Sequence, residues 1–194
     1  MLSNLPMFLT WLRIILIPLL VAIFYLPSTW LQPIGHDLAA TVIFIVAAAT
    51  DWLDGYLARR WNETSAFGAF LDPVADKLMV TAALIILVWL DRVDAIFAII
   101  IIGREITISA LREWMAQIGA HKSVAVSMIG KIKTFAQMLS IPLLLYHMPI
   151  GTFDAHVCGT WLMYVAAALT LWSMGYYMRM AWPHLTGDHA SLEK

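Results

Sequence analysis

The feature that most constrains this chain is a run of 22 residues without a charged side chain, at 157–178. A helix needs roughly 20 apolar residues to cross about 30 Å of hydrocarbon. Residues 5–26 and 133–150 form similar runs, with Arg13 and Lys133 as their charged residues. The chain as a whole is 61% hydrophobic and 13% charged, whereas about a quarter of a soluble domain is charged. We therefore expect an integral membrane protein.

Three further apolar runs are too short to cross a membrane alone. They cover 38–50, 78–90 and 95–103, and 13 residues of helix rise only about 20 Å. Each run reaches membrane length only by continuing through charged residues, which are Asp51, Asp54 and Arg59, then Asp72, Asp76 and Lys77, then Arg104, Glu105 and Arg112. Ionisable groups at membrane depth are costly and by default indicate a functional site that faces the bundle interior.

These runs together predict an all-α, polytopic membrane protein with six transmembrane helices. We expect one domain at 1–182 and a polar tail at 183–194. Six crossings place both termini on one side. That side carries most of the basic residues, whereas 27–37 and 151–156 have none, so the termini and the charged helix ends are expected to be cytoplasmic. The net charge of −1 argues against a nucleic-acid partner.

Four aspartates surround the short connection between the second and third predicted helices. Asp51 and Asp54 precede it, and Asp72 and Asp76 follow it. Spacings of three and four residues put each pair on one helix face, and an antiparallel hairpin brings the pairs to the same depth. Crowded acids either take up protons or bind cations. Oxygen ligands favour hard ions, so we expect two ions of Mg²⁺ or Mn²⁺.

The residues between these acids suit a bound polyanion. Gly55, Ala58 and Gly68 let a bulky group approach the backbone, and Arg59 can contact a phosphate. The alternative is a structural network in which the acids pair with Arg59, Arg60 and Lys77. Such a network leaves acids without partners.

The hairpin as a whole resembles the signature of the CDP-alcohol phosphatidyltransferases, DxxDGxxAR, eight residues, then GxxxDxxxD. None of its eight fixed positions departs from the signature. The resemblance implies six transmembrane helices, a homodimer and a di-metal site near the cytosolic face. It also implies transfer of a phosphatidyl group from CDP-diacylglycerol to an alcohol, with release of CMP.

Further segments resemble the bacterial phosphatidylglycerophosphate synthases within that family, namely 4–13, 103–106, 111–113 and 130–134. The resemblance implies the bacterial inner membrane and sn-glycerol 3-phosphate as acceptor. Arg104 and Arg112 are eight residues apart, within about 80° on a helix, and Lys131 and Lys133 open the next helix. This cationic cluster suits an acceptor that carries a phosphate. Lys131 and Lys133 could also be ordinary cytoplasmic charges.

The resemblance also suggests roles for individual residues. The metals would be held by Asp51, Asp54, Asp72 and Asp76, and Asp76 would also take the proton of the acceptor hydroxyl. CDP-diacylglycerol would be bound by Asp54, Gly55, Ala58, Arg59 and Gly68, and the acceptor phosphate by Arg104, Arg112, Lys131 and Lys133. Thr10 and Arg13 are expected at the interface, in contact with a nucleotide or headgroup.

Two alternatives stay open from the sequence. A sister enzyme would keep the hairpin but use inositol phosphate or phosphatidylglycerol as acceptor. A divalent-cation transporter would also place acids in the membrane, but it needs polar groups through the full thickness. Residues 84–90 and 141–146 are almost entirely apolar, which argues against transport.

Overall fold

The structure, a computed structural model, describes residues 5–61, 66–118 and 128–186. A helix lies at each of the six places that the hydropathy pattern predicts, and the bounds are α1 (Leu5–Ala22), α2 (Pro33–Trp61), α3 (Ala66–Trp89), α4 (Ala95–Gln117), α5 (Met128–Tyr146) and α6 (Ala155–Thr186). A short 3-10 helix, η1 (Ile23–Tyr25), follows α1. The antiparallel strands β1 (Pro149–Ile150) and β2 (Phe153–Asp154) join α5 to α6.

Several helix ends differ from the sequence prediction. The run expected at 133–150 is helical from 128 to 146, because His147 adopts a left-handed backbone (φ 57°) that ends the helix. The last helix extends four residues into the segment assigned to the polar tail. The connection predicted at 62–65 and the end of the tail, 187–194, lie outside the described residues.

Three helices within the described ranges are long and apolar enough to cross a membrane, at 8–25, 33–54 and 155–182. The apolar part of α5 is shorter, at 132–146. The chain is therefore a helical membrane protein by length and composition. Six crossings remain a prediction, since α3 and α4 carry their charges within the helix.

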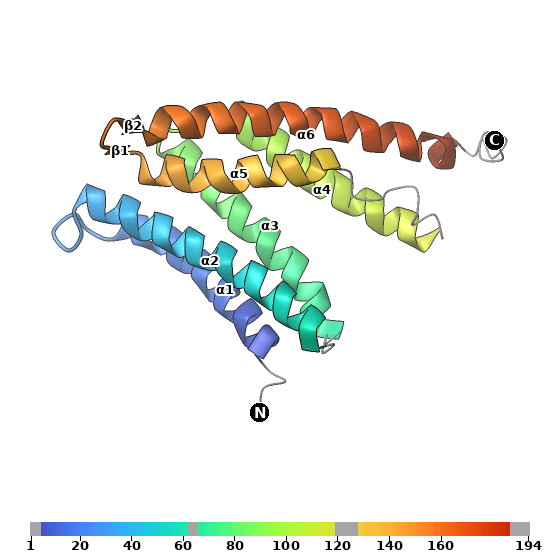
Figure 1. Cartoon of the computed structure of the whole chain (residues 1–194), viewed down its shortest axis with the longest axis horizontal. Helices are drawn as coiled ribbons and strands as arrows, with labels where there is room; N and C mark the ends of the chain where they lie inside the picture. Colours follow the sequence, from blue (N-terminus) through green and yellow to red (C-terminus); the bar gives the residue numbers. More distant parts are fainter. Residues whose placement is uncertain (1–4, 62–65, 119–127, 187–194) are drawn as a thin grey trace.

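The helices converge near the β1–β2 hairpin and diverge at the opposite end (Figure 1). There, α1 and α2 lie beside the first turns of α3 in one arm, whereas α4, α5 and α6 form the other arm. The helix α1 packs closely against both α2 and α3, and these two contact each other less. It therefore fills the space inside the predicted hairpin.

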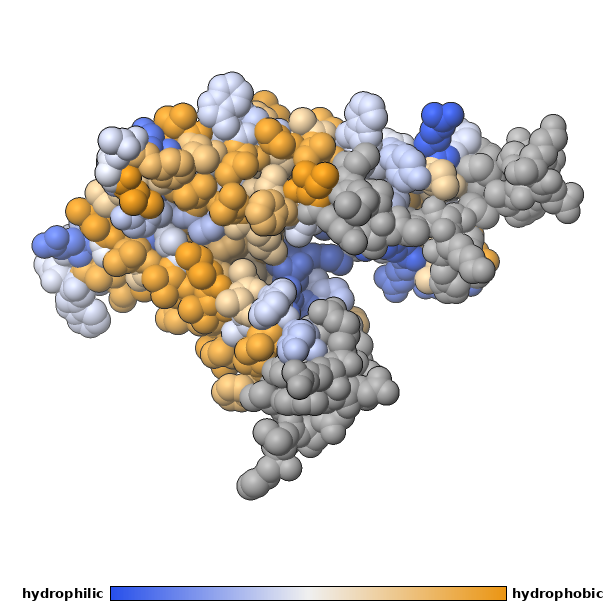
Figure 2. Space-filling view, viewed as in Figure 1, coloured by the Kyte–Doolittle hydropathy of each residue, from blue (hydrophilic) through white to orange (hydrophobic). Residues whose placement is uncertain are grey.

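The molecule is apolar outside and holds its charges inside. Large apolar side chains such as Ile99, Ile106 and Phe135 are exposed around the helices, whereas Arg13, Arg104 and Lys133 are buried. Figure 2 shows orange, hydrophobic surface over the converging end and blue, hydrophilic surface at the inner end of the hollow between the arms. This is the pattern expected of a bundle surrounded by lipid, with polar groups facing its interior.

The converging end is closed by Arg92, in the turn between α3 and α4. Its guanidinium pairs with Asp37 of α2 at 2.7 Å and donates to the carbonyl oxygens of Leu144 (3.2 Å) and Leu145 (2.7 Å) on α5. One side chain thus ties three segments together. The apolar core beneath it includes Leu84, Leu87 and Ile101.

Candidate active site

Arg13 of α1 holds the two aspartates of α2. Its Nη1 forms an ion pair with Asp51 Oδ1 at 2.8 Å, and its Nη2 donates to Asp54 Oδ2 at 2.6 Å. Arg13 is 1% exposed, and the side chains of Asp54 and Asp51 are 5% and 42% exposed. Arg13 therefore bridges a buried carboxylate, that of Asp54, and a partly exposed one, that of Asp51, which a ligand can still reach.

Thr10 makes the corresponding contact to α3. Its hydroxyl donates to Asp72 Oδ1 at 2.5 Å. Thr10 and Arg13 are three residues apart, so they share a face of α1. One turn of α1 therefore connects acids from both halves of the predicted hairpin.

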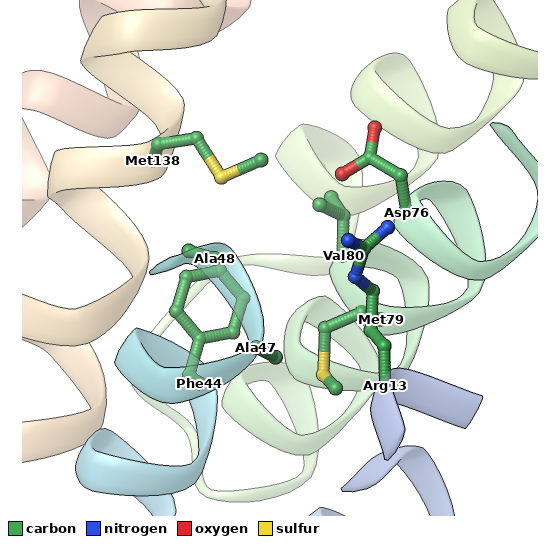
Figure 3. Close-up of a pocket in the computed structure, with 8 residues that line it drawn as sticks. All are labelled: Arg13, Phe44, Ala47, Ala48, Asp76, Met79, Val80 and Met138. Atoms are coloured by element: carbon green, nitrogen blue, oxygen red, sulfur yellow. The ribbon is translucent and has the colours of Figure 1, made fainter. Parts of the chain in front are cut away.

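Asp76 lies between two cavities. The smaller one, of about 10 Å³, has a polar side formed by Arg13 and Asp76, and Phe44 and Met138 lie on the opposite side (Figure 3). This volume holds about one water molecule at most. Asp76 also lines a wider cavity, so its carboxyl group can face both the Arg13 cluster and a ligand.

The wider cavity, of about 310 Å³, lies among α3, α4, α5 and α6. Its lining is mostly polar and charged, and comprises Pro73, Asp76, Lys77, Arg104, Glu105, Ser109, Arg112, Thr134 and Tyr177. The volume suits a small ligand. The basic side chains of Lys77, Arg104 and Arg112 outnumber the two carboxylates in this lining, so its net charge is positive. The cavity therefore favours an anionic ligand, which would also contact Asp76.

Two linked ion pairs lie beside the cavity. Lys133 of α5 is buried and forms an ion pair with Glu105, whose Oε1 also lies 3.3 Å from Arg104 Nη1. Lys133 is not among the residues lining the wider cavity, so it contacts the site through Glu105. The side chain of Lys131, the other predicted acceptor-binding lysine, lies outside the described residues.

The residues predicted to bind the nucleotide lie at the facing ends of α2 and α3. Gly55, Ala58 and Arg59 belong to the last turns of α2, although their side chains lie outside the described part of the chain. Gly68 belongs to the first turn of α3 and is buried. These positions place small residues beside the predicted metal-binding acids.

The donor set suits a divalent cation, because four carboxylates are hard oxygen ligands. In the part of the chain that the structure describes, however, no three His, Cys, Asp or Glu side chains converge as a metal site does. Asp51 and Asp54 both contact the guanidinium of Arg13. The four-aspartate metal centre therefore stays a prediction.

Several site residues could not be assigned from the sequence. Thr10 and Arg13 were expected at an interface, yet both are buried against the acids. The signal for them is a polar pair three residues apart on an otherwise apolar helix. Tyr177 and Ser173 of α6 had no such signal, because aromatic and small hydroxyl residues are common in membrane helices.

Replacing Arg13 with alanine is expected to destabilise the protein by about 3–5 kcal/mol, because the buried carboxylate of Asp54 would lose the guanidinium that pairs with it. Thermal unfolding of the purified protein in detergent measures this change. The matched control is Arg179→Ala, which removes an exposed arginine from α6 and should leave the melting temperature unchanged. Equal melting temperatures of the two variants would contradict the stabilising role of the buried Arg13–Asp54 ion pair.

Comparison with known proteins gives one family. The family model described as CDP-alcohol phosphatidyltransferase matches residues 3–172. A protein of Yersinia enterocolitica named CDP-diacylglycerol--glycerol-3-phosphate 3-phosphatidyltransferase is 49% identical over 187 residues, which cover 94% of this chain and 97% of the relative. A protein of Escherichia coli K12 with the same name is 50% identical over 184 residues, which cover 92% of this chain and 94% of the relative.

Proposed function

Because this chain belongs to the CDP-alcohol phosphatidyltransferase family, we propose that it transfers the phosphatidyl group of CDP-diacylglycerol to sn-glycerol 3-phosphate. The products are phosphatidylglycerol phosphate and CMP. The relatives that share about half of its residues carry the name of this activity. One observation supports the acceptor most directly: Asp76 lines the same cavity as Arg104 and Arg112.

The residues that line this cavity suggest how the acceptor binds. Arg104 and Arg112 bind the phosphate of glycerol 3-phosphate, since guanidinium groups match phosphate oxygens in charge and geometry. The hydroxyl of the bound acceptor then points toward Asp76. This carboxylate accepts the hydroxyl proton as the oxygen attacks the β-phosphorus of CDP-diacylglycerol. Lys131 adds positive charge from the start of α5, and Lys133 supports Arg104 through Glu105.

The nucleotide end lies where α2 and α3 face each other. Asp54, Gly55, Ala58, Arg59 and Gly68 bind the diphosphate and the nucleotide. The family generally depends on divalent cations, and Mg²⁺ or Mn²⁺ held by Asp51, Asp54, Asp72 and Asp76 would neutralise the charge that develops on the leaving CMP. Thr10 and Arg13 orient three of these carboxylates from α1.

The proposal also covers the arrangement of the chain in the membrane. Residues 1–182 form one six-helix domain in the bacterial inner membrane, with residues 183–194 as a polar extension. The site opens toward the cytosol, where both substrates' polar parts are found, and both termini lie on that side. The protein functions as a homodimer, as the family resemblance implies.

A transporter fits these observations less well. A conduction path would have to continue through the converging end. That end is filled by apolar side chains such as Leu84, Leu87 and Leu144, and Arg92 joins α2 to α5 across it. A sister enzyme with another acceptor remains the second candidate, because it would share the nucleotide end.

The test is release of labelled CMP from CDP-diacylglycerol by the purified protein. We expect release to depend on glycerol 3-phosphate and to stay at background with glycerol, inositol phosphate or phosphatidylglycerol. Arg104→Ala should raise the KM for glycerol 3-phosphate by about 10–100-fold, since one charged contact to the phosphate is lost. Release that depends on a different acceptor would assign the chain to a sister enzyme.

A further inference from the structure

One face of α6 carries buried polar and aromatic residues, and one of them, Tyr177, lines the acceptor cavity. Thr170, Ser173 and Tyr177 follow one another at spacings of three and four residues, so they share a face. All three are buried, and Ser173 and Tyr177 are each only 1% exposed. Their neighbours Trp172 and Tyr176 are exposed toward the outside of the bundle. The polar face is therefore directed into the bundle, where Ser173 and Tyr177 contact arginines of α4.

Tyr177 contacts both arginines of the cavity. The guanidinium carbon of Arg104 lies 5.6 Å from the centroid of its ring, and that of Arg112 lies 5.9 Å from the same centroid. Both distances fall within the roughly 6 Å range of cation–π attraction. Two like charges are thus held near one uncharged ring, and this contact uses none of the N–H donors of either guanidinium.

Ser173 holds Arg104 in a second way. Nη2 of Arg104 donates to the Ser173 hydroxyl at 3.1 Å, and this hydroxyl donates in turn to the Thr170 carbonyl oxygen at 2.9 Å. The hydroxyl hydrogen is therefore directed at the backbone, and the oxygen is left to accept from the arginine. Arg112 is exposed and forms no ion pair among the described residues, so the Tyr177 ring is its observed anchor.

We propose that Tyr177 and Ser173 are positioning residues that hold Arg104 and Arg112 ready for the acceptor phosphate. This inference rests on the proposed function. An arginine side chain loses rotamer freedom when it binds a ligand, and holding it in place beforehand removes part of that cost. Positioning therefore strengthens binding of the phosphate-bearing acceptor. It leaves the nucleotide end of the site unchanged.

The experiment compares Tyr177→Leu with Tyr177→Phe in the full-length protein. Leucine keeps apolar volume but removes the ring, and we expect the KM for glycerol 3-phosphate to rise about 10-fold. The values of kcat and of the KM for CDP-diacylglycerol should stay within about twofold. Phenylalanine restores the ring and should bring the KM for glycerol 3-phosphate back to within about threefold of the original value. The matched control is Trp172→Leu, which removes an exposed aromatic ring from the same helix and should change none of these values.

Ser173→Ala is an independent test of the positioning role, and it remains available if Tyr177→Leu does not fold. It should raise the KM for glycerol 3-phosphate by about fivefold, with kcat unchanged. The proposal is overturned if Tyr177→Leu raises both KM values equally, if phenylalanine behaves like leucine, or if Ser173→Ala has no effect. Failure of the proposed function itself looks different, because the unmodified protein would then show no CMP release dependent on glycerol 3-phosphate.

Discussion

Replacing Asp76 with asparagine is expected to lower kcat for phosphatidyl transfer by roughly 10²–10⁴-fold, the range that general-base groups contribute. The substitution keeps the shape of the side chain but removes its capacity to take a proton. Asp76 lines the cavity that also contains Arg104 and Arg112, so it is the carboxylate best placed to meet the acceptor hydroxyl. Binding of CDP-diacylglycerol should change little, since three aspartates remain at the nucleotide end.

The measurement pairs initial rates of CMP release with equilibrium binding of CDP-diacylglycerol. The control is Asp94→Asn, which alters the residue whose side chain accepts from Ile96 N at the start of α4, at the converging end. Asparagine caps a helix about as well as aspartate, so this variant should keep full activity. Loss of both transfer and CDP-diacylglycerol binding in Asp76→Asn would instead assign Asp76 to metal binding alone.

Removing divalent cations with EDTA is expected to reduce transfer to background, and Mg²⁺ or Mn²⁺ should restore it. The physical reason is the charge at the nucleotide end. Four carboxylates and a diphosphate repel one another unless cations lie between them, and the guanidinium of Arg13 already pairs with Asp51 and Asp54. Oxygen ligands favour hard ions, so we expect Mg²⁺ or Mn²⁺ to be effective at concentrations where Ca²⁺, with its larger radius, is not.

The readout is the rate of CMP release after dialysis against EDTA and after each metal is added back. A second readout is the melting temperature, which should rise when the effective metal is restored, because a ligand that binds only the folded state stabilises it. Asp51→Ala should weaken this shift. Full activity in protein shown to be free of divalent metal would contradict the metal-dependent mechanism.

Much of the fold could be predicted from hydropathy alone. Long apolar runs identified the helices because hydrocarbon requires backbone hydrogen bonds to be satisfied within each segment. The three short runs were also informative, since they had to continue through charged residues, and the structure shows helices through Asp54, Asp76 and Arg104. The acidic hairpin was found from spacing, because residues three or four apart share a helix face.

The arrangement of the hairpin was not predictable from spacing. The sequence predicts that α2 and α3 form an antiparallel hairpin with their acids at the same depth, but not which other helix packs against them. In the structure α1 lies against both, and its Thr10 and Arg13 contact acids from each. Local spacing carries no information about which third helix fills the space between two others. That choice depends on how side chains pack across the whole bundle.

The sequence by itself determined that this is a helical membrane protein with acidic residues on its second and third helices and a basic segment after them, because the cost of charge in lipid and the helix period act locally along the chain. Only the tertiary structure decided that Asp76 and the arginines of α4 line one cavity. It alone showed that Arg13 pairs with the acids of α2 and that Tyr177 lies against Arg104 and Arg112. These groupings join residues 28 to 73 positions apart, and they are selected by the packing of all six helices together.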